Sequence, residues 1–289
     1  MFRQYYKQVC DMKKNLWLFT LLLLSVSCNR MVVPVGEKLV TDSIQVVRGD
    51  SLLTMNIVWA KKTNPSWLAD SLNKALVRQF FYEESSDVRR VAQAEADSFY
   101  QDYLQYKSDF ESEPDLYMPE WGRSITARLD RETEHYYIFS GSDYVYMGGA
   151  HGGFQAVEYA VDKQTGETLS WEQLFKNPDD EVLATLVRVS LEKQYFQSSE
   201  DVFYFVEGGK FPLPVSAPSL RDEGILFQYQ QYEIAAYAYG LPGCVISYKD
   251  LMPYFNPEII EKLPCVDSQD STPAPQVSFL DRLRSLFKL

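Results

Sequence analysis

The side chains that could carry catalysis are few and widely spaced in this chain. Its 289 residues include two histidines, His135 and His151. A serine or cysteine nucleophile needs a base beside it, and no Gly-x-Ser-x-Gly elbow occurs in the sequence. We therefore expect no nucleophile triad. A carboxylate pair of the kind that hydrolyses glycosides stays open because the chain holds 40 acidic residues, and Glu158 and Glu233 are the two to inspect first.

The most distinctive segment is the glycine-rich run at 144–153, which reads Tyr-Val-Tyr-Met-Gly-Gly-Ala-His-Gly-Gly. Glycine-rich loops bind phosphate when they lead into a helix, usually with Lys or Ser/Thr. This run is expected between two strands and has none of those side chains, so we do not expect nucleotide binding. Its glycines predict a tight crossover with positive φ that holds His151 as a neutral ring or a partner contact. With two histidines and four cysteines in the chain, no metal site and no cofactor are expected.

The charge balance limits the kinds of partner. The chain has 28 Lys+Arg against 40 Asp+Glu, a net charge of −12 with a pI near 4.7. Nucleic acid requires a basic surface, so we expect no nucleic-acid partner. Hydrophobic residues make up 46% of the chain. That share suffices for a packed core and excludes wholesale disorder.

The N-terminus has the pattern of an export signal. Lys13 and Lys14 precede an apolar run over 16–26, which is too short to span a bilayer. The run ends in Leu-Ser-Val-Ser-Cys at 24–28, which is similar to a loose bacterial lipobox. We therefore expect residues 1–27 to be a lipoprotein signal peptide and lipid on Cys28 to anchor the protein to a membrane. The alternative is an ordinary signal peptide followed by an incidental cysteine.

Export to the cell envelope follows from this signal. Removal of residues 1–27 leaves 24 basic and 39 acidic residues, a net charge of −15. Asn29 and Arg30 after the lipidated cysteine are not acidic, which favours the outer membrane, facing the periplasm. Residues 28–36 are interpreted as a linker.

The first part of the folded module is expected over residues 37–120. The alternating pattern of 37–60 predicts a hairpin. Asn64 and Pro65 predict the N-cap and first residue of a helix. A second helix is expected over 87–110.

The second part, residues 121–265, is expected to consist of strands with few helices. The predicted strands are 124–131, 136–146, 154–161, 225–229 and 244–248. A helix capped by Asp179 and Asp180 is expected to bury Val182 and Val189, among other residues. Strands without a steady β-α-β alternation predict an α+β fold with a largely antiparallel sheet packed against helices. Residues 266–289 are interpreted as a flexible tail with a short amphipathic helix.

Two cysteines remain for the folded module after Cys10 is removed and Cys28 is lipidated. In an oxidising periplasm Cys244 and Cys265 could form a disulfide, which would contribute about 3 kcal/mol. Two buried thiols without a bond are the alternative.

The glycine-rich run and a second motif together resemble a known family. The second motif, at 230–240, reads Gln-Gln-Tyr-Glu-Ile-Ala-Ala-Tyr-Ala-Tyr-Gly and precedes the strand 243–248. The pair resembles an extracytoplasmic domain of unknown function (DUF3298-like, with a DUF4163-like N-terminal part). That domain occurs in the ectodomain of lysozyme-sensing anti-sigma factors (RsiV type) and in the N-terminal part of certain peptidoglycan deacetylases. The resemblance covers about residues 51–254, and Ala236 stands where the family usually has Pro.

The resemblance implies a sheet packed on helices outside the cytoplasm, without a recognised catalytic set. We therefore expect a non-catalytic envelope lipoprotein that binds a protein, such as a cationic, lysozyme-like one, or a cell-wall glycan. A strongly negative net charge speeds encounter with a cationic partner. The expected ligand contacts are Tyr146, His151, Tyr232, Glu233 and Tyr237. The alternatives are an envelope hydrolase that acts on glycans or peptides through a carboxylate pair, and a scaffold that recruits a partner through its tail.

Overall fold

The computed structural model describes residues 39–49, 52–111, 119–196 and 211–264. The predicted signal peptide, Cys28, the linker 28–36, Cys265 and the tail 266–289 lie outside the described residues. Among the described helices, none combines the length and the apolar character needed to cross a bilayer.

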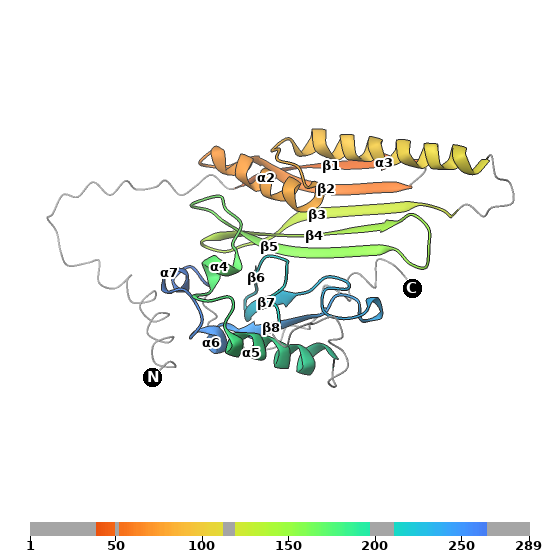
Figure 1. Ribbon diagram of the computed structural model, residues 1–289. Coiled ribbons are helices and arrows are strands. Elements are labelled where there is room, and N and C mark those ends of the chain that lie inside the picture. The colour runs from red at the N-terminus through yellow and green to blue at the C-terminus, as the bar shows by residue number, and fades with distance from the viewer. Residues whose placement is uncertain (1–38, 50–51, 112–118, 197–210, 265–289) are drawn as a thin grey trace, which may run out of the picture.

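A mixed five-stranded sheet forms the centre of the molecule (Figure 1). Its strands, in spatial order, are β1 (Val40–Arg48), β2 (Leu53–Lys62), β3 (Gly122–Glu132), β4 (Tyr136–Tyr146) and β5 (Gly153–Asp162). The pairs β1–β2, β3–β4 and β4–β5 are antiparallel, whereas β2 and β3 are parallel. A parallel pair requires a long crossover, and the two helices between β2 and β3 provide it. The predicted α+β class is confirmed.

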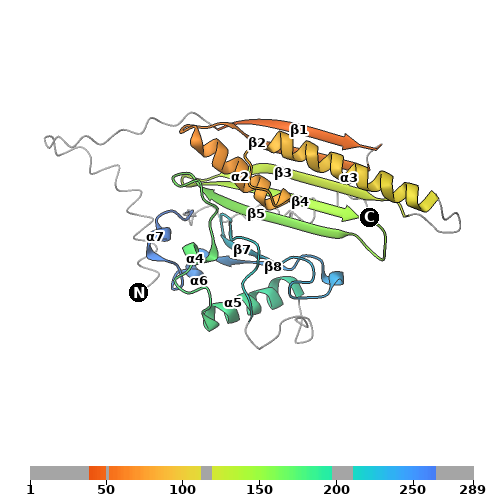
Figure 2. The ribbon, with the colours of Figure 1, turned by 45° about the horizontal axis from the view of Figure 1, so that its top comes forward.

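The crossover helices, α2 (Trp67–Phe81) and α3 (Val88–Glu111), cover one face of this sheet (Figure 2). Leu68, Leu72 and Leu76 recur every fourth residue along α2 and are buried in the core shared with the sheet. This spacing is the helical period that the sequence showed. The predicted N-cap at Asn64 is wrong, because the N-cap is Ser66.

The opposite face of the sheet is also buried, because β4 sends successive side chains into two different cores. Tyr137 and Phe139 pack in the core beneath α2 and α3. Tyr136 and Ile138 pack in a second core on the other face. The central sheet is therefore the middle layer of three.

The third layer contains a small antiparallel sheet and several short helices (Figure 1). Its strands are β6 (Ser219–Leu220), β7 (Gly224–Gln228) and β8 (Gly243–Ser247), and its helices are α4 (Trp171–Leu174), α5 (Glu181–Leu191), η1 (Glu192–Phe196), η2 (Tyr237–Tyr239), α6 (Tyr248–Leu251) and α7 (Pro257–Ile260). The carboxylate of Asp180 caps α5, accepting from the backbone N–H groups of Val182 and Leu183 at 2.9 and 3.0 Å.

The buried face of α5 differs from the predicted one. Val182 and Val189 are 64% and 52% exposed, so the prediction that they face inward is wrong. The helix turns Leu183, Val187 and Leu191 into the second core instead. Because these three residues are four apart, they form a stripe that excludes the two valines.

Cys244 lies buried in β8, with its sulfur 3.9 Å from the carbonyl oxygen of Val187. Burial raises the pKa of the Cys244 thiol to about 12. Since Cys265 lies outside the described residues, the bond between the two cysteines stays a prediction.

Candidate functional site

Two motifs that are distant in the sequence meet at one end of β4 and β5. The glycine-rich crossover between these strands holds His151, and the bend between β7 and β8 holds Tyr232 and Tyr237. The Nε2 atom of His151 lies 3.1 Å from the hydroxyl oxygen of Tyr232. Its ring stacks on the ring of Tyr237, with centroids 3.7 Å apart and planes inclined by 18°. Three of the five predicted contact residues are thus brought together in one aromatic cluster.

The backbone of the crossover depends on its glycines. Gly148 has φ of 97°, which a residue with a side chain rarely adopts. A Cβ atom on Gly152 would lie 2.6 Å from the ring of Tyr144. Glycine therefore allows the positive φ at position 148 and the close approach of position 152 to the Tyr144 ring.

The bend is held in a conformation that is costly for its residue type. Tyr232 has φ of 65°, and the left-handed region costs a non-glycine residue about 1–2 kcal/mol. Its side chain is nonetheless 50% exposed. An exposed aromatic ring on a strained backbone is typical of a functional position.

Tyr146 and Glu233 support this cluster from either side. The Tyr146 hydroxyl donates to the carbonyl oxygen of Gly149 at 3.1 Å and so ties down the crossover. The two carboxylate oxygens of Glu233 accept from the backbone N–H groups of Val215 and Gln230, each at 2.7 Å. Burial raises the pKa of the Glu233 carboxyl, although the two N–H groups act in the opposite direction. Tyr146 and Glu233 therefore both hold backbone segments in place and act as positioning residues.

A pocket of about 400 Å³ adjoins the aromatic cluster. It is lined by Asp143, Val145, His151, Gly152, Gly153, Phe154, Gln155, Gln230, Gln231 and Tyr232. The sequence did not single out the glutamines as lining residues, although the pair 230–231 opens the second motif. The hydroxyl of Tyr82, a residue that is 82% exposed, lies 3.5 Å from the amide oxygen of Gln155.

The acidic residue of this pocket, Asp143, is paired with a guanidinium that it shares with a second carboxylate. Asp143 receives two hydrogen bonds from the guanidinium of Arg123, at 3.2 and 2.8 Å, and Glu95 binds the same guanidinium at 2.5 Å. Burial lowers the pKa of Arg123, but the two carboxylates outweigh it and raise the pKa above its ordinary value. The arrangement suits a neutral polar ligand with apolar faces.

The carboxylates considered for hydrolysis are both occupied. Glu158 has a side chain 8% exposed and pairs with Arg131 at 3.1 Å and Arg221 at 2.7 Å. It also accepts from the hydroxyl of Ser219. Glu233 is bound by backbone, as described above. Across the part of the chain that the structure describes, no three His, Cys, Asp or Glu residues gather as ligands for a metal ion.

Comparison with known proteins finds a family model that matches part of this chain. Residues 156–249 match the model of DUF3298, described as a protein of unknown function. This match confirms the DUF3298 part of the predicted resemblance. The match contains the tyrosine bend and begins at β5, just after the glycine-rich crossover. No curated protein matches the chain.

Two solved structures described as DUF3298 family proteins share the fold. A DUF3298 family member from Bacteroides fragilis superposes with a TM-score of 0.64 at 21% identity, covering 78% of this chain and 96% of that one. A DUF3298 family protein from Pseudomonas aeruginosa PAO1 gives a TM-score of 0.54 at 16% identity, covering 79% and 98%. At these identities the likeness shows a common fold.

Proposed function

We propose that this protein is a non-catalytic binding module of the cell envelope, anchored by lipid on Cys28 to the outer membrane. Its ligand site is the cluster of His151, Tyr232 and Tyr237 with the adjoining pocket. The proposal includes the finer resemblance to the extracytoplasmic domains of RsiV-type anti-sigma factors and peptidoglycan deacetylases, with a DUF4163-like N-terminal part. The ligand that fits the site best is a cell-wall glycan.

The observation that carries this proposal is the exposed aromatic cluster beside an amide-lined pocket. Aromatic rings pack on the apolar faces of a ligand, and a few fixed polar groups orient it. Here His151 is exposed and is held in place by two tyrosines. Gln155 and Gln231 offer neutral hydrogen-bonding groups in the same pocket. A sugar chain presents this combination of apolar faces and hydroxyl groups.

The fixed carboxylates favour recognition over reaction. An inverting or retaining hydrolase needs one carboxyl group as acid and a second as base or nucleophile, on either side of the scissile bond. The two guanidiniums on Glu158 and the two N–H groups on Glu233 leave neither carboxylate open to substrate. The hydrolase alternative would therefore have to use other carboxylates.

A cationic protein is the second candidate ligand, and the net charge is what favours it. The chain without its signal peptide carries −15, which attracts a basic partner over a screening length of about 8 Å at physiological salt. Such binding would weaken steeply as salt is raised, whereas glycan binding to neutral amides would not.

Titration of the detergent-solubilised full chain with purified glycan strands from peptidoglycan tests the proposal. We expect saturable binding that changes less than twofold between about 0.05 and 0.5 M salt. His151→Ala and Tyr237→Ala should each weaken it about tenfold or more, since each removes half of the ring stack. Trp67→Ala, which removes a ring 43% exposed on α2, is the matched control and should leave binding unchanged.

Three results would overturn the proposal. Absence of saturable binding would remove the glycan as ligand. Equal affinity of the His151→Ala variant would remove the site. Turnover of the strands by the purified protein would replace recognition with hydrolysis. Binding of a basic protein such as lysozyme that is lost at ~0.5 M salt would instead favour the second candidate.

A further inference from the structure

Two exposed tyrosines beside the proposed ligand pocket share an unusual backbone conformation. Outside glycine, Tyr82 and Tyr232 are the two described residues with positive φ, at 55° and 65°. This left-handed region disfavours residues that carry a Cβ atom. Tyr232 lines the pocket beside His151. The Tyr82 hydroxyl lies 3.5 Å from the amide oxygen of Gln155, which is another lining residue. Both tyrosines with a costly backbone therefore adjoin the same pocket.

The place of Tyr82 at the end of α2 does not by itself require a tyrosine. Its backbone N–H donates to the carbonyl oxygen of Arg78 and ends the helix in the left-handed conformation. Glycine is the usual residue for such an ending, because it has no Cβ atom. The Tyr82 side chain is 82% exposed, so packing in the core does not account for the ring either. A costly backbone that presents an exposed ring points to a use for that ring at the surface.

Gln155 connects this ring to the pocket and has hydrogen-bonding groups to spare. Its one side-chain hydrogen bond among the described residues is the contact with Tyr82. At 3.5 Å that contact is longer than an ordinary O–H···O hydrogen bond. Gln230 and Gln231, by contrast, use their side-chain oxygens on backbone N–H groups of β5. The two N–H groups of the Gln155 amide are therefore open to a ligand.

Tyr82 is near the pocket without being part of its lining. The Cα atoms of His151 and Gln155 are at most about 14 Å apart, because four residues span no more than that. The hydroxyl of Tyr82 adjoins Gln155, yet Tyr82 is not among the residues that line the pocket. A ligand that fills the pocket and also packs on the Tyr82 ring must therefore extend out of the pocket, past Gln155.

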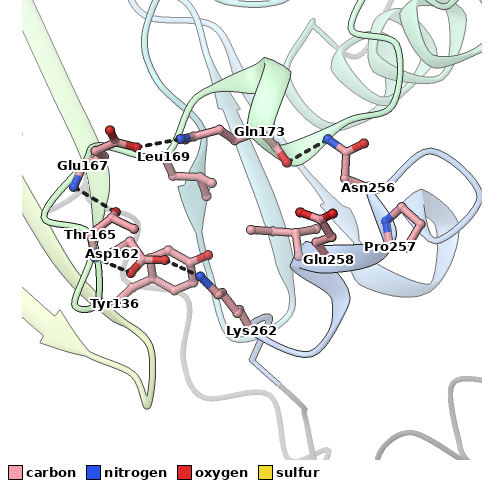
Figure 3. A pocket seen from close by; sticks show the side chains of 11 residues that line it. Tyr136, Asp162, Thr165, Glu167, Leu169, Gln173, Asn256, Pro257, Glu258 and Lys262 are labelled. Atoms are coloured by element: carbon pink, nitrogen blue, oxygen red, sulfur yellow. Dashed lines mark hydrogen bonds and ion pairs between the residues drawn. The ribbon is translucent and has the colours of Figure 1, made fainter.

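The larger cavity at the opposite end of β4 and β5, of about 500 Å³, has no comparable surface (Figure 3). Tyr136 is the aromatic residue in its lining, and it is fully buried. Polar side chains of this lining bind one another, since Lys262 pairs with Asp162 at 2.7 Å and Gln173 donates to Glu167 at 3.2 Å. Of these two cavities, the one beside the aromatic cluster thus combines exposed rings with an open amide.

We propose, resting on the glycan function proposed above, that Tyr82 and Gln155 form a second sugar subsite, so that the protein binds an internal stretch of a glycan chain rather than a single terminal sugar. One sugar occupies the pocket against the aromatic cluster. The chain continues past Gln155, whose amide N–H groups donate to its hydroxyl or acetamido oxygens. The next sugar packs its apolar face on the Tyr82 ring.

Titration of the detergent-solubilised full chain with glycan fragments of two lengths tests this subsite. The probes are the disaccharide repeat of peptidoglycan and a strand of three such repeats. We expect the unchanged protein to bind the longer strand about tenfold more tightly, which is the order of one aromatic contact together with one hydrogen bond. His151→Ala should weaken the binding of both probes, because both occupy the pocket beside the aromatic cluster.

Tyr82→Gly separates the subsite from the fold. Glycine suits the left-handed backbone, so the variant should have a Tm at least as high as that of the unchanged protein. It should nevertheless bind the three-repeat strand about tenfold more weakly, while its affinity for the disaccharide changes less than about twofold. Tyr82→Phe keeps the ring and should change neither affinity by more than about twofold. Trp67→Ala, which removes another exposed ring of α2, is the matched control and should leave both affinities unchanged.

The contrary results separate this subsite from the glycan function as a whole. If the three-repeat strand binds Tyr82→Gly as tightly as the unchanged protein, the second subsite is wrong and the proposed glycan site stands. Equal affinity of the unchanged protein for the two probes has the same meaning. If Tyr82→Gly loses affinity for both probes together with a lowered Tm, the ring supports the fold and not the ligand. If neither probe binds the unchanged protein, the glycan function fails and the subsite fails with it.

Discussion

The side-chain amide of Gln230 binds both backbone groups of Ala156. Its Nε2 atom donates to the carbonyl oxygen of Ala156 at 2.9 Å, and its Oε1 atom accepts from the N–H group at 3.2 Å. Next to it, the Oε1 atom of Gln231 accepts from the N–H group of Phe154 at 2.9 Å. Because β5 is an outer strand of its sheet, these amides occupy backbone groups that would otherwise be open to another strand.

Replacement of these glutamines should therefore cost unequal amounts of stability. Gln230→Ala removes two hydrogen bonds to β5 and one to Ser216, so we expect a loss of about 2–3 kcal/mol in the free energy of unfolding. Gln231→Ala removes one, and we expect about 1 kcal/mol. Urea denaturation of both variants measures the difference. Equal losses would contradict the assigned roles.

Gly141 in the middle of β4 should not tolerate a side chain. A Cβ atom there would lie 2.4 Å from both the ring of Phe80 and the carbonyl oxygen of Thr126. Since Thr126 is part of the neighbouring strand, it cannot move aside, and we expect Gly141→Ala to cost about 3 kcal/mol. Gly122→Ala, which meets no described atom within 4 Å, is the control. Thermal unfolding should show a lowered Tm for the first variant and little change for the second.

Glu158 should be important for stability because two guanidiniums depend on it. Glu158→Ala removes the carboxylate that pairs with both Arg131 and Arg221. Arg131 then keeps only the longer contact with Asp130 at 3.5 Å among its described carboxylate partners, and the Nε atoms of both arginines already have no partner among the described residues. Such losses reach about 3–5 kcal/mol for fully buried pairs, and about 2 kcal/mol is expected here because both arginines retain some exposure. Glu134→Ala, at a side chain 77% exposed, should change the unfolding free energy by less than ~0.5 kcal/mol. A stable Glu158→Ala variant would contradict the structural role.

The ion pair of Asp162 and Lys262 should give stability that depends on pH. Burial alone would raise the pKa of the Asp162 carboxyl, but Lys262 and the N–H groups of Gln164 and Thr165 hold it below its ordinary 3.8. A carboxyl whose pKa is lower in the folded protein stabilises the fold above the pKa of the unfolded chain. That stabilisation is lost as the pH falls through the folded value.

Asp162→Asn tests this dependence. At pH 7 we expect the variant to be about 2 kcal/mol less stable than the unchanged protein. The difference should shrink as the pH falls below about 4, as measured by urea denaturation at a series of pH values. A difference that grows toward acid would show that the pKa is shifted in the other direction.

Membrane association should depend on Cys28. Cys28→Ala should move the protein from the membrane fraction to the soluble fraction of fractionated cells, because the proposed acyl chains each contribute about 0.8 kcal/mol per buried CH₂. Globomycin-type inhibition of lipoprotein signal processing offers an independent check on the unchanged chain. If the variant stays with the membrane, the alternative of an incidental cysteine gains support.

Local patterns were sufficient to predict most of the individual elements. The predicted strand 136–146 coincides with β4, and the predicted helix 87–110 differs from α3 by one residue at each end. Both depend on short-range periodicity, which is present in the sequence itself. Val182 and Val189 were misassigned because apolar type alone does not decide which side of a short helix meets the core.

Only part of the candidate site could be predicted from the sequence. Glycines around His151 and tyrosines at 232–239 made both motifs visible. Their meeting did not follow from either motif, since His151 and Tyr232 are 81 residues apart. The roles of Gln230 and Gln231 were also missed, because a glutamine that covers a strand edge looks like any polar residue in a bend.

By itself the sequence determined the α+β class, the two motifs and the acidic charge, because composition and short-range spacing carry this information. Tertiary structure alone decided that β2 and β3 run parallel and that His151 stacks on Tyr237. These features join segments far apart in the chain, and their geometry depends on how whole layers pack against each other.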